Sequence, residues 1–161
     1  MIVSRCATVV SPWYRQFYLR RGAARWASDE VSTEGYEARL DAIGGFVYVG
    51  TEMYGSPTEV IVEVHDTEPP VAENADRVVD ASVGGDGPLA VLSWGEQEPD
   101  VVIDVPGGTL RLRAAWSGLS EAQGHADQEV GGDERSPERV LLQVWAAAIR
   151  SPIVQRRWAC S

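Results

Sequence analysis

The chain has 161 residues, of which 44% are hydrophobic and six are Trp, and this composition suits one domain with a packed core rather than a disordered chain. Its formal net charge of −10 argues against direct contact with nucleic acid, because binding phosphate requires a basic stripe. We therefore predict a single domain over residues 1–161, and a basic protein is the more natural partner.

The charges are unevenly placed along the chain. Residues 1–25 and 139–161 contain Arg and no acid, so all 24 Asp and Glu lie between them. If the two termini are neighbours in the fold, a basic patch faces a strongly acidic remainder, and this field could steer a partner. The alternative is that the charge only keeps the protein in solution.

Alternation of apolar and polar residues, interrupted by Gly, Pro and Asp clusters, recurs along nearly the whole chain and is typical of successive β-strands. The nine predicted strands are 5–10, 15–21, 44–51, 58–66, 76–83, 88–94, 100–105, 109–116 and 139–147. Segment 25–42 is expected to be a long ordered loop with a turn of helix after Ser28, ended by Gly35. We predict little other helix.

The alternation within a strand also predicts which side chains are buried. In 109–116, Leu110, Leu112 and Trp116 fall on one side, and Arg111 and Arg113 fall on the other. One apolar and one solvated face is the pattern of antiparallel sheets. The predicted fold is therefore all-β, an antiparallel β-sandwich of about nine strands with long loops, and a barrel is the alternative.

Residues for catalysis or metal binding are scarce. The two histidines are His65, expected to be half-exposed on a strand, and His125, expected to be a solvated loop residue. No serine lies in a nucleophile elbow, and no paired Cys or His motif has the spacing of a zinc site. We therefore expect no enzyme activity, no metal and no cofactor.

The cysteines and the terminus bear on location. The N-terminus has no basic region followed by an apolar run of secretory length, and no stretch could span a bilayer, so we expect a cytoplasmic protein. The two cysteines are Cys6 and Cys160. They could be brought together on terminal strands, but a cytosolic pair is usually reduced.

The tryptophans have open roles. Trp116 and Trp145 lie in apolar strands and are expected in the core. Trp13, Trp26 and Trp158 have Arg nearby, where cation–π packing and binding are equal alternatives. Trp94 could be exposed at the edge of a sheet.

A long acidic connection joins the strand that ends at Trp116 to the strand that begins at 139. We predict that residues 117–136 form a recognition surface, mobile when free, that steers a basic partner. The alternative is an unselected insertion, since long loops cost little entropy. Four of its acids could also chelate calcium, although their spacing matches no EF-hand loop. The predicted partner-binding residues are Glu121, Asp127, Glu129, Asp133 and Glu134.

Parts of the chain resemble a known family over roughly residues 11–116. They are WYRQFYLRRG, with an aromatic-x-Gln-Phe pattern at Tyr14, Gln16 and Phe17; EGYEARLDAIGGFVYVGTEMYGSPTEVIVEVHD, with its Gly-Tyr pair; and VVIDVPGGTLRLRAAW, with its Pro-Gly-Gly turn. These stretches resemble the ComJ family, also called Nin, inhibitors of a DNA-entry nuclease. The resemblance implies a small acidic cytoplasmic protein that binds and suppresses a nuclease.

The chain departs from that family after Trp116, in the acidic connection, the last predicted strand and the C-terminal tail. The leading hypothesis is a non-enzymatic acidic inhibitor or immunity-like protein that binds a basic partner through its acidic surface. The expected basic partner is a nuclease. The alternative is a ligand-binding or scaffold β-sandwich domain with no inhibitory role, in which Trp residues line a pocket or a contact surface.

Overall fold

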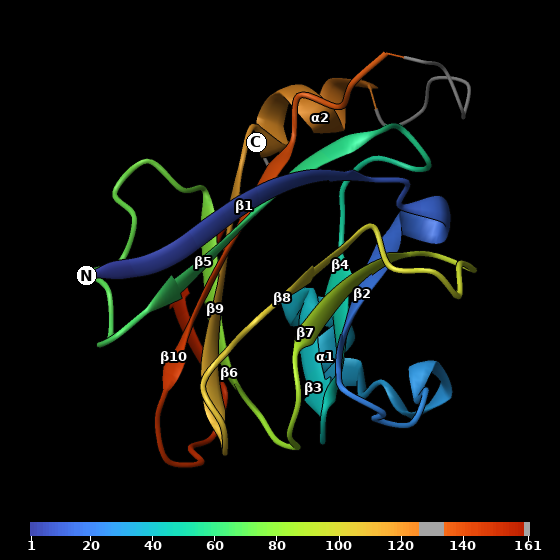
Figure 1. The fold of residues 1–161 in the computed structure, drawn as a ribbon. Coiled ribbons are helices and arrows are strands. Elements are labelled where there is room, and N and C mark those ends of the chain that lie inside the picture. Colours follow the sequence, from blue (N-terminus) through green and yellow to red (C-terminus); the bar gives the residue numbers. More distant parts are fainter. Residues whose placement is uncertain (126–133, 160–161) are drawn as a thin grey trace.

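The computed structural model describes residues 1–125 and 134–159, which form eleven strands and four short helical segments (Figure 1). The strands are β1 (Ile2–Val10), β2 (Gln16–Arg21), β3 (Leu40–Ile43), β4 (Phe46–Gly50), β5 (Thr58–His65), β6 (Arg77–Val83), β7 (Leu89–Ser93), β8 (Val101–Ile103), β9 (Leu110–Ser117), β10 (Arg139–Ala146) and β11 (Ile153–Arg156). The helical segments are the 3₁₀ turns η1 (Trp13–Arg15) and η2 (Ser28–Glu30) and the α-helices α1 (Thr33–Ala38) and α2 (Leu119–His125).

The strands form two sheets. One has six strands in the order β1-β5-β10-β9-β6-β11, and the other has five in the order β3-β4-β2-β7-β8. The paired strands are antiparallel except β5 and β10, which run in parallel with Val62 opposite Leu142. The acidic connection after β9 leads back into β10, which enters the sheet between β9 and β5.

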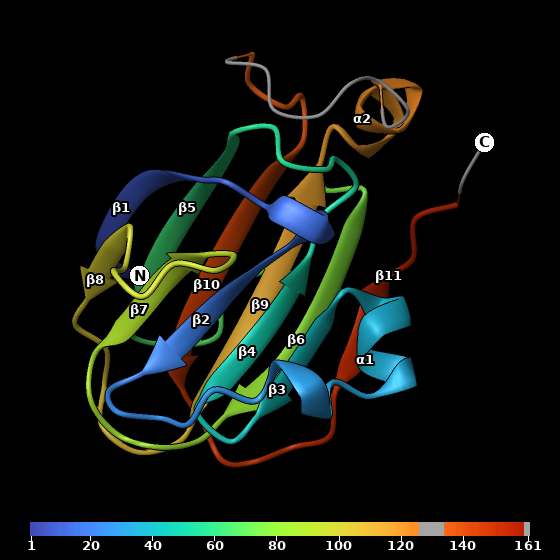
Figure 2. The same cartoon turned by 90° about the vertical axis from the view of Figure 1, so that its right-hand side faces the viewer.

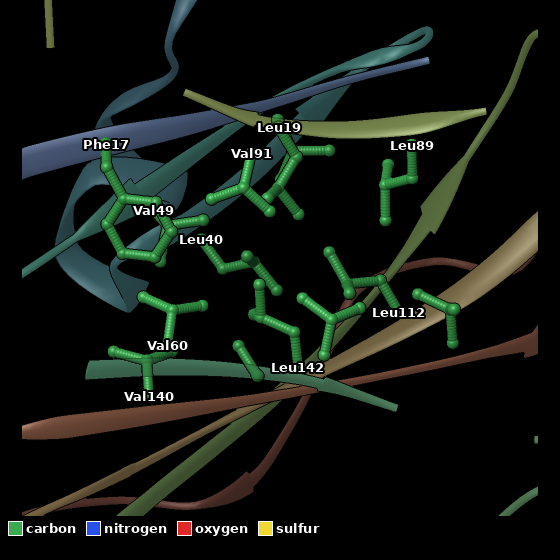
Figure 3. Packing of buried hydrophobic residues seen from close by; sticks show 14 of the residues in the cluster. Phe17, Leu19, Leu40, Val49, Val60, Leu89, Val91, Leu112, Val140 and Leu142 are labelled. Atoms are coloured by element: carbon green, nitrogen blue, oxygen red, sulfur yellow. The ribbon is translucent and has the colours of Figure 1, made fainter. Parts of the chain in front are cut away.

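A single large apolar cluster lies between the two sheets (Figure 3). The five-stranded sheet contributes Phe17 and Leu19 from β2, and the six-stranded sheet contributes Val60, Leu112 and Leu142, all fully buried. Each such side chain stabilises the fold by about 1.5–3 kcal/mol relative to an exposed position. This packing fixes the strand ends from which the loops project.

Each of the nine predicted strands is present, with its ends shifted by a few residues. The predicted number is wrong, because β3 and β11 bring the described strands to eleven. Both extra strands are only four residues long, and β11 pairs with β6 at the sheet edge, so neither has enough alternation to be recognised. The expectation of antiparallel pairing is wrong only for β5 and β10.

The turn of helix expected at Ser28 is present as η2, and a second helical segment, α1, follows it in 25–42. The helix α1 begins after Ser32, whose Oγ accepts a hydrogen bond from the Gly35 backbone N–H at 3.0 Å. Gly35 was expected to end the helix but lies inside α1. A Cβ at this position would lie 2.4 Å from the Asp41 side chain, so the close contact requires glycine. Arg39 ends the helix in a left-handed conformation.

Burial of the inward face of β9 is confirmed, but the prediction for its outer face is wrong. Arg111 and Arg113 are both buried, because the 66–76 connection and the segment after β10 cover this face. Arg113 makes a two-pronged contact with Asp80, with N–O distances of 2.8 and 2.9 Å. His65, expected to be half-exposed, is buried beside Glu63.

The helices of the described residues are short. The longest, α2, has seven residues, and none in residues 1–125 or 134–159 is long and apolar enough to cross a membrane.

Candidate functional site

The five predicted partner-binding acids are only partly placed by the structure. Glu121 is exposed on α2, and Glu134 is exposed shortly before β10. Asp127, Glu129 and Asp133 lie outside the described residues. Within 117–136, expected to be a loop, residues 119–125 form the helix α2.

The beginning of the acidic connection is packed onto the protein. The Leu119 N–H donates to the Asp76 carboxylate at 3.1 Å, and Leu119 and Ala122 are fully buried. Gly118 has a φ of 73°, and a Cβ at this position would lie 2.2 Å from the Pro137 carbonyl oxygen. The connection therefore leaves and rejoins the sheet at one place, and Gly is required there.

The end of the acidic connection is anchored by a buried carboxylate. Glu138 is fully buried and accepts hydrogen bonds from the backbone N–H groups of Glu52, at 2.8 and 3.0 Å, and Met53, at 3.3 Å. Burial raises the pKa of Glu138 to about 7, against the opposing effect of these hydrogen bonds. Arg39 forms an ion pair with Glu52 beside it. Glu138 thus ties the connection to the loop 51–57.

The loop 51–57 carries one member of an exposed group of rings. Tyr54 contacts Trp13 and Tyr14, with ring centroids 5.9 and 5.3 Å apart, and Tyr14 contacts Trp94 at 4.6 Å. Trp13 and Trp94 are each 37% exposed and Tyr14 is 55% exposed. We call these four residues the aromatic platform. They come from η1, the loop after β4 and the end of β7, which adjoin one another at one end of the sheets (Figure 1).

The backbone under the aromatic platform is in an unfavourable conformation. Tyr14 and Arg15 have φ values of 56° and 60°, in the left-handed region that favours glycine. Two loop contacts hold this turn: Thr51 N–H donates to the Arg15 carbonyl at 2.9 Å, and Gly55 N–H donates to the Pro12 carbonyl at 3.0 Å. Such strain costs of order 1–3 kcal/mol per residue and is often found at functional sites.

An acidic loop borders the aromatic platform. Residues 94–100 contain Glu96, Glu98 and Asp100 and no cation. Asp100 is used structurally, since it accepts from the Ser93 hydroxyl at 2.7 Å, and the Ser93 hydroxyl accepts from the Ser11 N–H. Glu96 and Glu98 are exposed, and neither takes part in a salt bridge with the described residues.

The other tryptophans have mainly packing roles. Trp116 is buried and donates its indole N–H to the Gly50 carbonyl, and Trp145 is buried under Arg113. Trp26 packs on Tyr18 and Phe46, and Trp158 lies under Arg39. The sequence alone does not decide the roles of Trp13 and Trp94, and it does not single out Tyr54. The available signal was that these aromatic residues stand at the end of a predicted strand or within a few residues of one.

A cavity of about 610 Å³ lies next to the acidic loop and is lined by Arg20, Trp26 and residues 95–98. Within residues 1–125 and 134–159, no three His, Cys, Asp or Glu side chains form a group that could hold a metal ion. Asp127, Glu129 and Asp133, three of the four acids that could chelate calcium, lie outside the described residues. In the described part of the site, therefore, the geometry offers aromatic contact surface and carboxylates.

Neither a protein-family model nor a curated protein matches the chain. Among solved structures it is similar to ComJ of Bacillus subtilis, an inhibitor of the DNA degrading activity of NucA, with 14% identity, a TM-score of 0.67, and coverage of 91% of this chain and 99% of ComJ. It is also similar to the crocagin biosynthetic gene J protein, with 16% identity, a TM-score of 0.54, and coverage of 88% and 98%. The expected resemblance is thus confirmed in three dimensions, and the chain has the fold of ComJ.

Proposed function

We propose that this protein is a non-enzymatic, acidic inhibitor or immunity-like protein of the cytoplasm that binds a basic partner, a nuclease. The observation that carries the proposal is the similarity to ComJ, an inhibitor of NucA, over nearly the full length of both chains. The two packed sheets act as a single-domain β-sandwich scaffold, and the loops at one end provide the contact surface.

Electrostatics gives this proposal a mechanism. A nuclease must attract phosphate, so its substrate site presents cations, and a folded array of carboxylates competes for the same cations. This chain carries a formal net charge of −10, and exposed acids stand on α2, beside β10 and in the 94–100 loop. Seated on the site, the protein also blocks the approach of DNA. Neither effect requires a catalytic group on the inhibitor.

The test is inhibition of a purified nuclease. The first probe is NucA, and the second is any basic nuclease that the immobilised chain retains from its native cytosol. Degradation of plasmid DNA should fall in proportion to added protein and stop at a fixed molar ratio. Polyglutamate at the same total charge should inhibit far less, because it lacks the shape of the folded surface. Undiminished degradation with both probes would contradict the proposal.

A second candidate is a ligand-binding or scaffold domain with no inhibitory role. Two observations favour it: the cavity lined by Trp26 and Arg20, and the similarity to a protein of crocagin biosynthesis. In that case the chain would leave nuclease activity unchanged, and a bound small molecule would change the fluorescence of Trp26. Replacing Trp26 by Phe would remove this response, which separates the two candidates.

A further inference from the structure

We propose that the aromatic platform is the docking centre for a basic protein, with an arginine or lysine side chain of that protein lying against the rings and pairing with Glu96 and Glu98. The inference rests on the proposed function, since it names the surface through which such an inhibitor would bind. It assigns the centre of the contact to a different place from the 117–136 connection.

The rings suit this occupant. The faces of Trp and Tyr are electronegative and attract guanidinium and ammonium groups, and Trp and Tyr are frequent at the centres of protein interfaces. Trp13, Tyr14 and Trp94 remain between a third and just over half exposed in spite of their mutual contacts. Because neighbouring rings already hold one another, little side-chain freedom is lost when a partner binds.

The surrounding charge specifies a basic partner. Segments 11–15 and 94–100 together contain three acids and one cation, Arg15, and Arg20 lines the cavity beside residues 95–98, so acids still outnumber cations around the rings. Glu96 and Glu98 are exposed and take no part in a salt bridge with the described residues, so they are free to pair with a cation. An acidic partner would be repelled by them, and a neutral partner would leave two carboxylates partly desolvated without compensation.

The strained turn shows that the arrangement is specified by the structure. Tyr14 and Arg15 adopt left-handed conformations although neither is glycine. Hydrogen bonds from the loop 51–57 hold this turn, and the Ser11–Ser93–Asp100 chain holds it from the other side. The result is that Tyr14 contacts both Tyr54 and Trp94 on the surface. Burial in the core does not account for this conformation, since Tyr14 is mostly exposed.

A titration with hexa-arginine peptide tests the proposal without a known partner. In nitrogen-15-labelled protein, the indole N–H signals of Trp13 and Trp94 should shift in a saturable way. The signals of Trp116 and Trp145 should stay in place, because both residues are buried. Hexaglutamate should shift none of them. Changing Trp13 and Trp94 to Ala together should weaken peptide binding about fivefold or more, a loss expected for a cation on aromatic faces.

The matched control is Tyr36→Ala, which removes another exposed ring, stacked on Tyr48 and outside the aromatic platform. It should bind the peptide as the wild type does. The remaining indole signals report whether each variant is folded. Peptide-induced shifts that spare Trp13 and Trp94 would overturn the proposal. So would a change of these two signals on dilution of the protein alone, because a second copy of the chain would then cover the rings.

The inhibition assay separates this inference from the proposed function. If the wild type inhibits a nuclease and the Trp13→Ala/Trp94→Ala variant inhibits equally well, the function stands and the docking centre is wrong. If the wild type inhibits no nuclease but the peptide still shifts Trp13 and Trp94, the proposed function fails and the aromatic platform remains a site for basic chains.

Discussion

The outer face of the six-stranded sheet and the aromatic platform reverse the usual distribution of side chains. On the sheet face, Arg113 and Asp80 are charged and almost completely buried, with 2% and 1% of their surfaces exposed. In the aromatic platform, Trp13 and Tyr14 are large rings left partly open to solvent. Figure 2 shows β11 and α1 beside β6, whereas η1, the dark-blue turn before β2, lies in the upper middle of the view.

The exceptions on the sheet face have a structural cause, whereas those in the platform point to function. The buried charges of the sheet face are paired and hydrogen-bonded: Arg113 contacts Asp80 and the Pro69 carbonyl, and Gln155 donates to Asp80. They bind the covering segments to the sheet, so they serve the fold. Three ring–ring contacts join the members of the platform, and the turn that carries Tyr14 is strained although this side chain is mostly exposed, so the arrangement requires an explanation outside the fold.

The largest expected effect is on the sheet face. Asp80→Ala should lower the free energy of unfolding by about 3–5 kcal/mol, because Arg113 would be left buried without its counter-ion. Denaturant unfolding measures the change. The control Glu68→Ala breaks the half-exposed pair with Arg150 and should cost less than about 1 kcal/mol. Equal losses in both variants would mean that the buried pair is not structural.

The same comparison can be sharpened with a double change. Asp80→Leu combined with Arg113→Leu removes both charges and keeps apolar volume, so it should recover much of the stability that Asp80→Ala loses. If the double variant is as unstable as the single one, the hydrogen bonds to Pro69 and Gln155 matter more than the uncompensated charge.

The next effect concerns Glu138, which immediately precedes β10 and is hydrogen-bonded to the loop 51–57 that carries Tyr54. The folded protein holds its proton up to a pKa of about 7, while the unfolded chain releases it near the usual value of 4.5. Between these values the folded state binds more protons, so this group's contribution to stability falls as pH rises from 4.5 to 7. The total change is about 3 kcal/mol.

The measurement is the unfolding free energy of the wild type minus that of Glu138→Gln across this pH window. The variant cannot titrate at this position, so the difference should slope downward with rising pH and level off above pH 7. A difference that is constant across the window would show that burial does not shift the pKa of Glu138 in the folded state.

A smaller, stabilising effect is expected in the aromatic platform. Arg15→Gly should relieve the left-handed strain at φ 60°, offset in part by the greater freedom of Gly in the unfolded chain, for a net gain below about 1 kcal/mol. Thermal unfolding measures it. Arg15→Ala removes the same side chain but keeps the strain, so it should not gain. If the Arg15→Gly variant unfolds at a lower temperature than the Arg15→Ala variant, the turn is not strained in solution.

The smallest expected effect on stability is in the acidic connection. Neutralising Glu121, Asp127, Glu129, Asp133 and Glu134 together should leave unfolding unchanged but slow association with the nuclease identified by inhibition. The wild-type association rate should fall steeply as the salt concentration rises. A single change such as Glu134→Gln should alter the free energy of binding by only about 0.2–1 kcal/mol.

Replacing only residues 126–133 by a Gly-Ser linker is a cleaner version, because Leu119, Ala122 and Glu138 keep their buried places. Unchanged association kinetics across a range of salt concentrations in that variant would show that this part of the connection does not steer the partner. It would leave the acids of the 94–100 loop and those of α2 as the alternatives.

The positions of nine strands, and the inward faces of the long ones, follow from the pattern of residues along the chain. Leu110, Leu112 and Trp116 are buried as their alternation predicts. This works because a strand repeats every two residues, so its apolar face can be read from neighbours in the chain. Short strands carry too few repeats, which is why β3 and β11 were not predicted.

The segments that cover each outer surface become known only from the folded chain. Arg113 is buried because Pro69 and Trp145, far away in sequence, lie over or beside it, and Glu138 is buried because the loop 51–57 folds onto it. Tyr14, Tyr54 and Trp94 likewise meet only when three loops reach the same end of the sheets. Local periodicity contains no information on such contacts, since they depend on chain crossings between distant segments.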